Sequence, residues 1–226
     1  MNADRRSVYT FLSKELNNNV FYYFDDPALT PSCWELIYER YLNLEEQAYH
    51  HSLHPNRARE YLISRITLKD AVRKFLQNSN SKSLIPPNKI SVRHNEKGKP
   101  CLYGHQKLSG IEISIAHKGT EAVVMVLNKP VGIDIEKIEP RSTSFSTIAF
   151  TPYELKLLKE QENLPEWVTR FWVTKEAYGK MLGVGLQGNP KQYEIESINK
   201  DELKIKDTAI KTTLHRNNFI VGWTQK

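Results

Sequence analysis

Residues 131–140, VGIDIEKIEP, place two carboxylates two positions apart in an otherwise apolar, β-branched segment. Because side chains alternate faces along a strand, Asp134 and Glu136 are expected on one face, about 6.6 Å apart along the chain. Gly132 shares that face and leaves room for something to approach. Two such carboxylates repel one another unless a cation lies between them, and paired oxygen ligands suit Mg²⁺. Acids on the wet face of a half-exposed antiparallel strand are an equally good interpretation.

A second group of reactive side chains follows in residues 165–183, PEWVTRFWVTKEAYGKMLG. Trp172, Glu176 and Lys180 are spaced four residues apart and therefore share one face of a helix. A Glu four residues before a Lys is also an ordinary surface pair, worth about 0.2–0.5 kcal/mol. Alone, the surface pair is the better interpretation. Beside two strand carboxylates, Glu176 would complete a set of metal ligands and Lys180 would neutralise phosphate.

These two segments resemble the paired motifs of the 4′-phosphopantetheinyl transferases. GIDIE at 132–136 is similar to the family's GxDxE motif, and WVTKEA at 172–177 is similar to WxxKEA. Upstream, GKPC at 98–101 and ISIAH at 113–117 resemble the GKP and (S)H elements. FTPYE at 150–154 matches the F-x-x-x-E segment, and REYLISR at 59–65 matches an arginine-bearing helix of the N-terminal half.

The resemblance implies an α+β fold of the larger, surfactin-synthetase-activating type. Such chains are pseudo-dimers of two similar α+β halves with the active site at their interface. We expect an N-terminal half at 1–110 and a C-terminal half at 111–226 that carries the metal site. An internal echo agrees, since LNLEEQAYHHSL and ISRITLKDAV resemble FTPYELKLLKEQ and RFWVTKEAYG. Chance similarity between amphipathic helices is the alternative explanation.

The resemblance also implies a reaction: transfer of 4′-phosphopantetheine from coenzyme A to a serine of an apo acyl or peptidyl carrier protein. The second product is adenosine 3′,5′-bisphosphate. By the same resemblance, Asp134, Glu136 and Glu176 hold Mg²⁺, and Lys180 stabilises charge on the leaving phosphate. Glu176 is the preferred base for the serine proton, and neutral Lys180 is its rival.

Coenzyme A contacts are implied by resemblance alone. His117 and Lys99 resemble the family's contacts to the 3′-phosphate, and Arg59 is a looser candidate for the nucleotide end. A strand-end histidine satisfied by backbone is the ordinary alternative for His117. Ala116 stands where the family usually has serine, so one hydroxyl contact is missing.

Two further charged residues have structural explanations. Thr151, Pro152 and Glu154 form a capping box with proline at the first helical position, so helix capping comes before any active-site role for Glu154. Arg65 interrupts an apolar helical stripe, and a buried arginine needs a carboxylate or a phosphate as partner. Pairing within the fold is the simpler expectation.

The elements that position these residues follow from periodicity. Asn56 is expected to cap a helix over 57–76, and helical periodicity returns over 145–183. Between them, KISVRH, CLYG, IEISIAH, EAVVMVL and VGIDIEKI predict strands. YEIESI, ELKIKD and NNFIVGWTQ predict antiparallel strands near the end of the chain.

Composition sets broad limits. The 226 residues are 39% hydrophobic, which suits one large or two small domains, and no apolar run is long enough to span a membrane. The first residues lack the apolar core of a secretory signal, and two cysteines give no disulfide framework. We therefore expect a cytoplasmic protein, and the resemblance to pseudo-dimeric chains implies a monomer. No zinc spacing, Walker motif or Rossmann motif occurs.

The formal charge of +6 is dispersed along the chain. It suits a phosphorylated ligand or an acidic partner, although an ordinary basic surface explains it as well. Nucleic-acid binding has no supporting motif, and a non-catalytic module that binds coenzyme A or carrier proteins is the main alternative to the transferase. The loop at 137–150 is a candidate docking element. Whether the carrier belongs to fatty-acid, polyketide or nonribosomal-peptide synthesis stays open.

Overall fold

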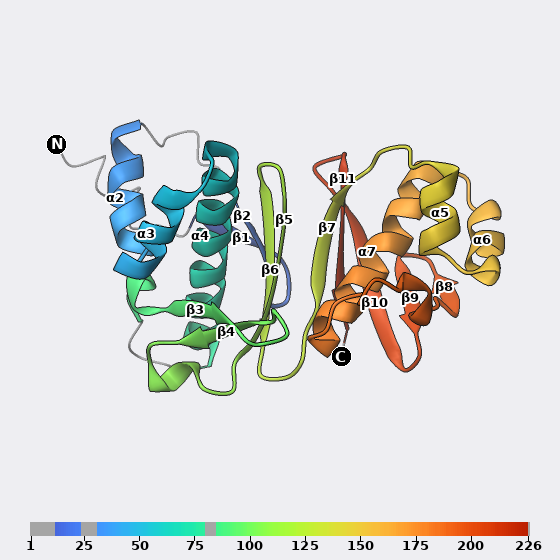
Figure 1. The fold of residues 1–226 in the computed structure, drawn as a ribbon. Helices are drawn as coiled ribbons and strands as arrows, with labels where there is room; N and C mark the ends of the chain where they lie inside the picture. The colour runs from blue at the N-terminus through green and yellow to red at the C-terminus, as the bar shows by residue number, and fades with distance from the viewer. Residues whose placement is uncertain (1–11, 24–30, 80–84, 226) are drawn as a thin grey trace. The chain divides into compact units, whose positions relative to one another are not determined.

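The computed structural model describes residues 12–23, 31–79 and 85–225 and divides into two compact units (Figure 1). Unit 1 comprises Met1–Arg93 and Pro100–Lys129, and unit 2 comprises His94–Lys99 and Pro130–Lys226. The expected boundary after residue 110 therefore moves to residue 129. The reason is that β5 (Glu112–Lys118) and β6 (Glu121–Leu127) pair with each other, and β6 pairs with a strand near the start of the chain.

Unit 1 is an antiparallel sheet in the order β1-β2-β6-β5, with the long helix α4 packed on it. Leu68 and Val72 of α4 meet Phe21, Val124 and Val126 of the sheet in one buried apolar cluster. The other elements of this unit are α2, α3 and the small hairpin β3-β4. The bounds are β1 Ser13–Asn17, β2 Val20–Tyr23, α2 Pro31–Tyr41, α3 Leu44–Ser52, α4 Pro55–Asn78, β3 Ser91–His94 and β4 Pro100–Tyr103.

The start of α4 differs from the prediction. The helix begins at Pro55 with His54 as its N-cap residue, and no side chain caps it. Asn56 is thus a helical residue, and its predicted capping role was wrong. Proline at the first helical position lacks the N–H that a cap would satisfy and presets the helical φ, so Pro55 begins the helix instead.

Unit 2 is a five-stranded antiparallel sheet in the order β7-β11-β10-β9-β8, with α7 packed on β7, β11 and β10. The helical periodicity over 145–183 corresponds to three separate helices. Pro152 and Pro165 each lie in the first turn of a new helix, where a ring that blocks continuation is tolerated. The bounds are β7 Ile133–Lys137, α5 Thr143–Ala149, α6 Pro152–Lys159, α7 Leu164–Leu182, β8 Ser197–Asn199, β9 Glu202–Ile205, β10 Thr208–His215 and β11 Phe219–Thr224. None of the described helices combines the length and the apolar composition needed to cross a membrane.

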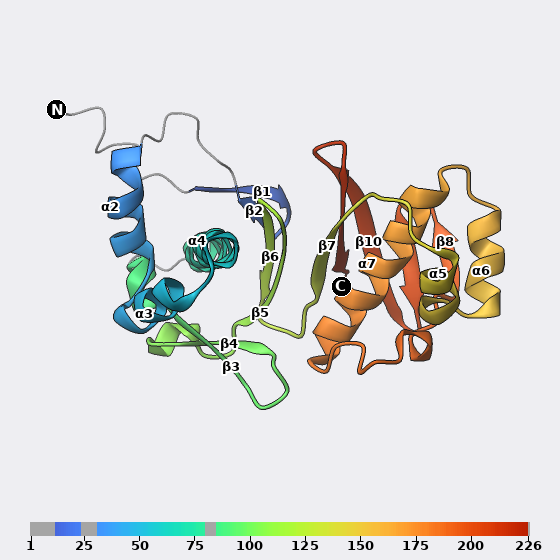
Figure 2. The same cartoon turned by 45° about the horizontal axis from the view of Figure 1, so that its top comes forward.

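Both units repeat one topology, which supports two similar halves. In unit 1, β2 is followed by α2, α3 and α4 and, after β3 and β4, by the hairpin β5-β6, whose second strand pairs with β2. In unit 2, β7 is followed by α5, α6 and α7 and, after β8 and β9, by the hairpin β10-β11, whose second strand pairs with β7. In each unit the last helix lies along the sheet (Figures 1 and 2).

A buried ion pair recurs at the same place in each half. Glu154 closes a capping box with Thr151, as predicted, and its carboxylate accepts from Lys175 Nζ at 2.8 Å. Glu46 closes a capping box with Asn43 and accepts from Lys69 Nζ. The internal echo of the sequence therefore has a structural counterpart, with Glu46 rather than its neighbour as the equivalent of Glu154.

Helix α7 approaches strand β7 so closely that only glycine fits between them. A Cβ on Gly132 would lie 1.8 Å from the carbonyl oxygen of Ala177 in α7. On the neighbouring strand, Gly222 pairs with Asp134, and a Cβ there would lie 2.4 Å from Val173 Cγ1. The room that Gly132 leaves is thus filled by helix backbone. Asp134 is only 6% exposed, so the interpretation as a wet strand face was wrong for it.

Gly132→Ala should lower the free energy of unfolding by about 3 kcal/mol or more, because α7 must shift away from β7. Chemical denaturation of the purified variant measures this. Gly119→Asn is the matched control, since Gly119 has a positive φ of 61°, which Asn tolerates, and no atom within 4 Å of an added Cβ. Equal stability of the two variants would contradict the close packing.

Lys175→Met should cost about 3–5 kcal/mol of stability, because it leaves the Glu154 carboxylate buried without its cation. Both side chains of this pair are 0% exposed. Lys156→Met in α6 is the control, because Lys156 is exposed and the substitution should change stability by less than about 0.5 kcal/mol. A small effect at both positions would show that the buried pair contributes little.

Candidate metal and phosphate site

Three carboxylates and one ammonium group come together between β7 and α7. Asp134 and Glu136 lie on β7, and Glu176 and Lys180 lie on α7. The register of β7 against β11 holds the strand residues, and the contact of α7 with Gly132 brings the helix residues to them. All four were predicted as site residues, and unit 2 places them together.

Asp134 is held by Lys180. The Lys180 Nζ donates to Asp134 Oδ1 at 2.7 Å. The other carboxylate oxygen, Oδ2, is buried and has no hydrogen-bond partner. Burial raises the pKa of Asp134 and the charge of Glu136 raises it further, while the Lys180 ammonium opposes both. One oxygen of this carboxylate is therefore open to a further cation.

Glu176 lies among like charges. Its side chain is partly exposed, and burial raises its pKa from 4.5 to about 7. The charges of Asp134 and Glu136 add to the rise, and Lys180 opposes it. Glu176 is thus close enough to both strand carboxylates to interact with them electrostatically, and a cation shared among them would relieve the repulsion.

The donor types and the charge of this cluster fit Mg²⁺, which prefers carboxylate oxygens. Asp134 Oδ2 is buried and has no hydrogen-bond partner, so one carboxylate oxygen is available to a cation. Within the described ranges, however, no three His, Cys, Asp or Glu side chains are already arranged as a metal site. Protein cations occupy carboxylate oxygens instead: Lys180 on Asp134, and an arginine on Glu136.

That arginine is Arg141, which the sequence analysis did not single out. Its Nη2 lies 3.2 Å from Glu136 Oε2, and its Nη1 lies 3.6 Å from Glu139 Oε1. The residue belongs to the loop that was proposed as a docking element. Arg141 lies five residues after Glu136 in a loop, so neither strand nor helix periodicity could predict its contact with the Glu136 carboxylate.

Lys99 belongs to unit 2 through the hairpin tip at His94–Lys99. Its backbone N–H donates to Asn95 Oδ1 at 2.9 Å, and its aliphatic stem passes Gly183, where a Cβ would lie 3.0 Å from Lys99 Cδ. Gly183 is the αL residue that ends α7. The stem of Lys99 is thus fixed against the end of the helix that carries Glu176.

His117 and Arg59 belong to unit 1. His117 Nδ1 lies 3.7 Å from Glu60 Oε2, and the imidazole side chain is 39% exposed. Arg59 is exposed on the first turns of α4, next to Glu60 in sequence. The imidazole is thus accessible but paired with a carboxylate, and its predicted contact with a phosphate stays a prediction.

Arg65 is explained by the fold of unit 1. Its Nε lies 3.5 Å from Glu46 Oε1, and its guanidinium lies 4.5 Å from the centre of the Tyr61 ring. The residue is only 7% exposed. Arg65 therefore belongs to the buried ion cluster around Glu46, in agreement with the expected structural pairing.

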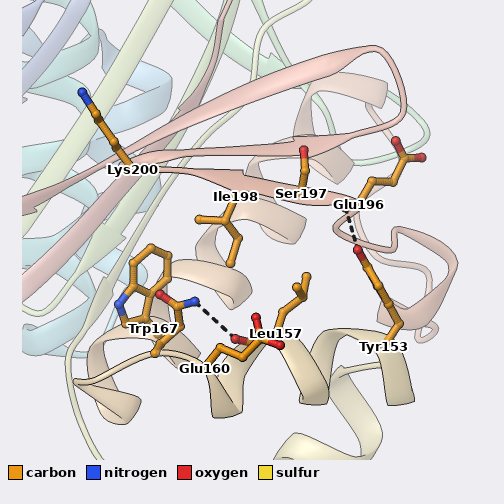
Figure 3. A pocket seen from close by; sticks show the side chains of 9 residues that line it. Tyr153, Leu157, Glu160, Trp167, Glu196, Ser197, Ile198 and Lys200 are labelled. Carbon is orange, nitrogen blue, oxygen red and sulfur yellow. Dashed lines mark hydrogen bonds between the residues drawn. The ribbon is translucent and has the colours of Figure 1, made fainter.

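A cavity of about 470 Å³ also lies in unit 2, between α6, the start of α7 and the edge strand β8 (Figure 3). Its lining is mixed, with apolar side chains such as Leu157, Trp167 and Ile198 beside polar and charged ones, and Tyr153 Oη donates to the Glu196 carbonyl at 3.0 Å. None of the predicted site residues lines it.

Comparison with known proteins agrees with this geometry. Residues 130–224 match the model of the 4′-phosphopantetheinyl transferase superfamily, a region that contains both motifs. The chain is 33% identical over 104 residues to a 4′-phosphopantetheinyl transferase of Bacillus subtilis, covering 45% of each chain. It is 31% identical over 99 residues to the transferase Sfp of B. subtilis strain 168, covering 43% of each. The chain thus spans about half the length of these curated relatives.

A longer match extends across both units. The transferase gsp of Aneurinibacillus migulanus is 26% identical over 181 residues, which covers 79% of this chain and 66% of gsp. Among solved structures, a holo-(acyl-carrier-protein) synthase from Bacillus anthracis in complex with CoA (3′,5′-ADP) matches 42% of this chain and 81% of that chain. The identity there is 24% and the TM-score is 0.35. Residues 130–224, which contain both motifs, are thus similar to the 4′-phosphopantetheinyl transferase superfamily.

Proposed function

We propose that this protein transfers 4′-phosphopantetheine from coenzyme A to a serine of an apo carrier protein and releases adenosine 3′,5′-bisphosphate. The observation that carries the proposal is the cluster of Asp134, Glu136, Glu176 and Lys180 between β7 and α7. Three carboxylates beside one ammonium group form a site for a metal-bound pyrophosphate rather than for a neutral ligand.

Asp134, Glu136 and Glu176 would hold Mg²⁺. When bound, the ion supplies a template and a Lewis acid for the diphosphate. Two features support this assignment: Asp134 Oδ2 has no hydrogen-bond partner, and Glu176 lies among like charges that raise its pKa and that a cation would offset.

Lys180 is better suited to the cationic role than to the basic one. Its Nζ donates to the Asp134 carboxylate at 2.7 Å, which is the contact of an ammonium group with its counterion. In that form Lys180 stabilises negative charge on the leaving phosphate. The serine proton then goes to Glu176, a carboxylate on the same face of α7 as Lys180.

We assign the nucleotide end of coenzyme A to Lys99, His117 and Arg59 on the strength of the motif resemblance. Lys99 is supported by its fixed stem, and His117 by its accessibility. Binding of a phosphate by His117 requires that the imidazole exchange Glu60 for the ligand. A monomeric, cytoplasmic enzyme without nucleic-acid or membrane partners stays our prediction.

The decisive experiment is a mass-shift assay in which the protein, Mg²⁺ and coenzyme A are incubated with a panel of apo carrier proteins. Addition of a phosphopantetheine mass to a carrier serine supports the transferase and identifies its carrier class. Binding of coenzyme A or carrier without any mass shift across the panel would favour the non-catalytic module instead.

Glu136→Ala should retain the fold and lose at least about 100-fold in transfer rate, because one of three proposed metal ligands is missing. The measurement is the initial rate of carrier modification at saturating coenzyme A and Mg²⁺. Glu162→Ala, which removes an exposed carboxylate from the loop before α7, is the control and should keep the wild-type rate. Full activity of Glu136→Ala would reject the metal role.

Stability without metal should depend on the protonation of Glu176. The pKa of Glu176 in the folded state is raised from 4.5 to about 7. Its contribution to the free energy of unfolding is therefore fully present below pH 4.5 and is lost as the pH rises through 7. Between pH 5 and 8 the wild type should therefore lose about 2–3 kcal/mol relative to Glu176→Gln. Denaturation of both proteins in chelator measures the difference, and parallel pH curves would contradict the raised pKa.

A further inference from the structure

Arg141 contacts the proposed metal site although no motif includes it. The guanidinium bridges two carboxylates, with Nη2 3.2 Å from Glu136 Oε2 and Nη1 3.6 Å from Glu139 Oε1. The Arg141 and Glu136 side chains are 21% and 17% exposed, so solvent screens this pair less than an ordinary surface pair. Arg141 therefore holds one of the three carboxylates that the metal requires.

The helices fix Arg141 in this position. Its guanidinium lies 5.2 Å from the centre of the Phe145 ring in α5. The Phe145 ring makes an edge contact with Trp172 of α7 at 5.1 Å, and Trp172 lies one turn before Glu176 on the same face. The Ser142 side chain caps the first turn of α5 by accepting from the Phe145 N–H at 3.1 Å. Arg141 is thus tied to the helix that carries the third carboxylate.

The ion pair of Arg141 leaves one of its hydrogen-bond donors without a partner. Arg141 Nε is buried and has no hydrogen-bond partner. The Arg141 side chain is also 21% exposed, compared with 9% for Arg65 in the buried cluster of unit 1, so its guanidinium can reach solvent when it leaves the carboxylate. An arginine with one open donor, beside a carboxylate that the metal also needs, fits an interaction that exchanges.

We infer that Arg141 is a positioning residue that competes with the divalent cation for Glu136 and so lowers the metal affinity of the ligand-free protein. The inference rests on the proposed metal role of Glu136. When a divalent cation takes the carboxylate, the guanidinium has to give up the Glu136 Oε2 contact, and this exchange opposes metal binding. Without the arginine, the carboxylate cluster keeps its full negative charge for the metal.

The test is the dissociation constant for Mg²⁺, measured by isothermal titration calorimetry on protein free of coenzyme A. Arg141→Ala should bind Mg²⁺ about tenfold more tightly than wild type, because one unit charge close to the site is removed. Arg141→Lys keeps the charge and should stay close to the wild-type constant. Arg93→Ala, which removes an exposed arginine paired with Glu45 at 3.1 Å in unit 1, should leave it unchanged.

Unchanged or weaker Mg²⁺ binding by Arg141→Ala would overturn the inference, and so would an equal gain in Arg93→Ala. If Arg141→Ala does not fold, Arg141→Gln retains a polar side chain of intermediate length against Phe145 and gives the same comparison. The binding constant is independent of carrier modification. A protein that binds Mg²⁺ as predicted but modifies no carrier would sink the proposed transferase and leave the role of Arg141 standing.

Discussion

The contact of the α7 backbone with Gly132, directly before β7, determines where the charged side chains of unit 2 meet. Helices normally rest on a sheet through side chains, whereas here the carbonyl oxygen of Ala177 takes the place of a missing Cβ. The close approach leaves Asp134 almost without solvent and puts Glu176 in the same poorly hydrated space. Carboxylates crowded in this way need cations, and the fold supplies two from its own side chains, Lys180 and Arg141.

The two units share one topology, but the acidic residue at the equivalent position has a different role in each. Asp70 of α4 stands in the place of Glu176 of α7, each directly after the lysine of a buried pair. Asp70 accepts hydrogen bonds from the Leu12 N–H at 2.7 Å and from the Tyr41 hydroxyl at 2.7 Å. The Asp70 carboxylate therefore anchors the start of the sheet of unit 1. The Glu176 carboxylate of unit 2 instead lies near the like charges of Asp134 and Glu136, which suits it to binding a cation.

Local signals in the sequence predicted local features of the structure. The alternation of VGIDIE predicted the strand, the spacing of Glu176 and Lys180 predicted their shared helix face, and the capping box of Glu154 was confirmed. The start of a helix at Pro152 was predicted, but the helix starts marked by Pro55 and Pro165 were not, which explains the misplaced start of α4 and the missing break before α7.

Contacts between segments that are far apart in the chain could not be predicted from the sequence. β1 and β2 carry no strong periodic signal, so the pairing that draws β5 and β6 into unit 1 could not be predicted, and the boundary was misplaced. The Arg141–Glu136 pair depends on the path of a loop. The burial of Asp134 depends on a helix that follows much later in the chain. Such contacts are set by tertiary packing rather than by local propensity.

The pairing of β7 with β11 has a consequence for biosynthesis. Among the described strands, β7 hydrogen-bonds only to β11, whose residues Phe219–Thr224 are made long after Ile133–Lys137. During translation the acidic strand therefore emerges from the ribosome with no neighbour to receive its backbone N–H and C=O groups. This pairing can form only after Phe219–Thr224 have been made, so unit 2 should mature after unit 1, and the unpaired backbone of β7 is exposed to chaperones until then.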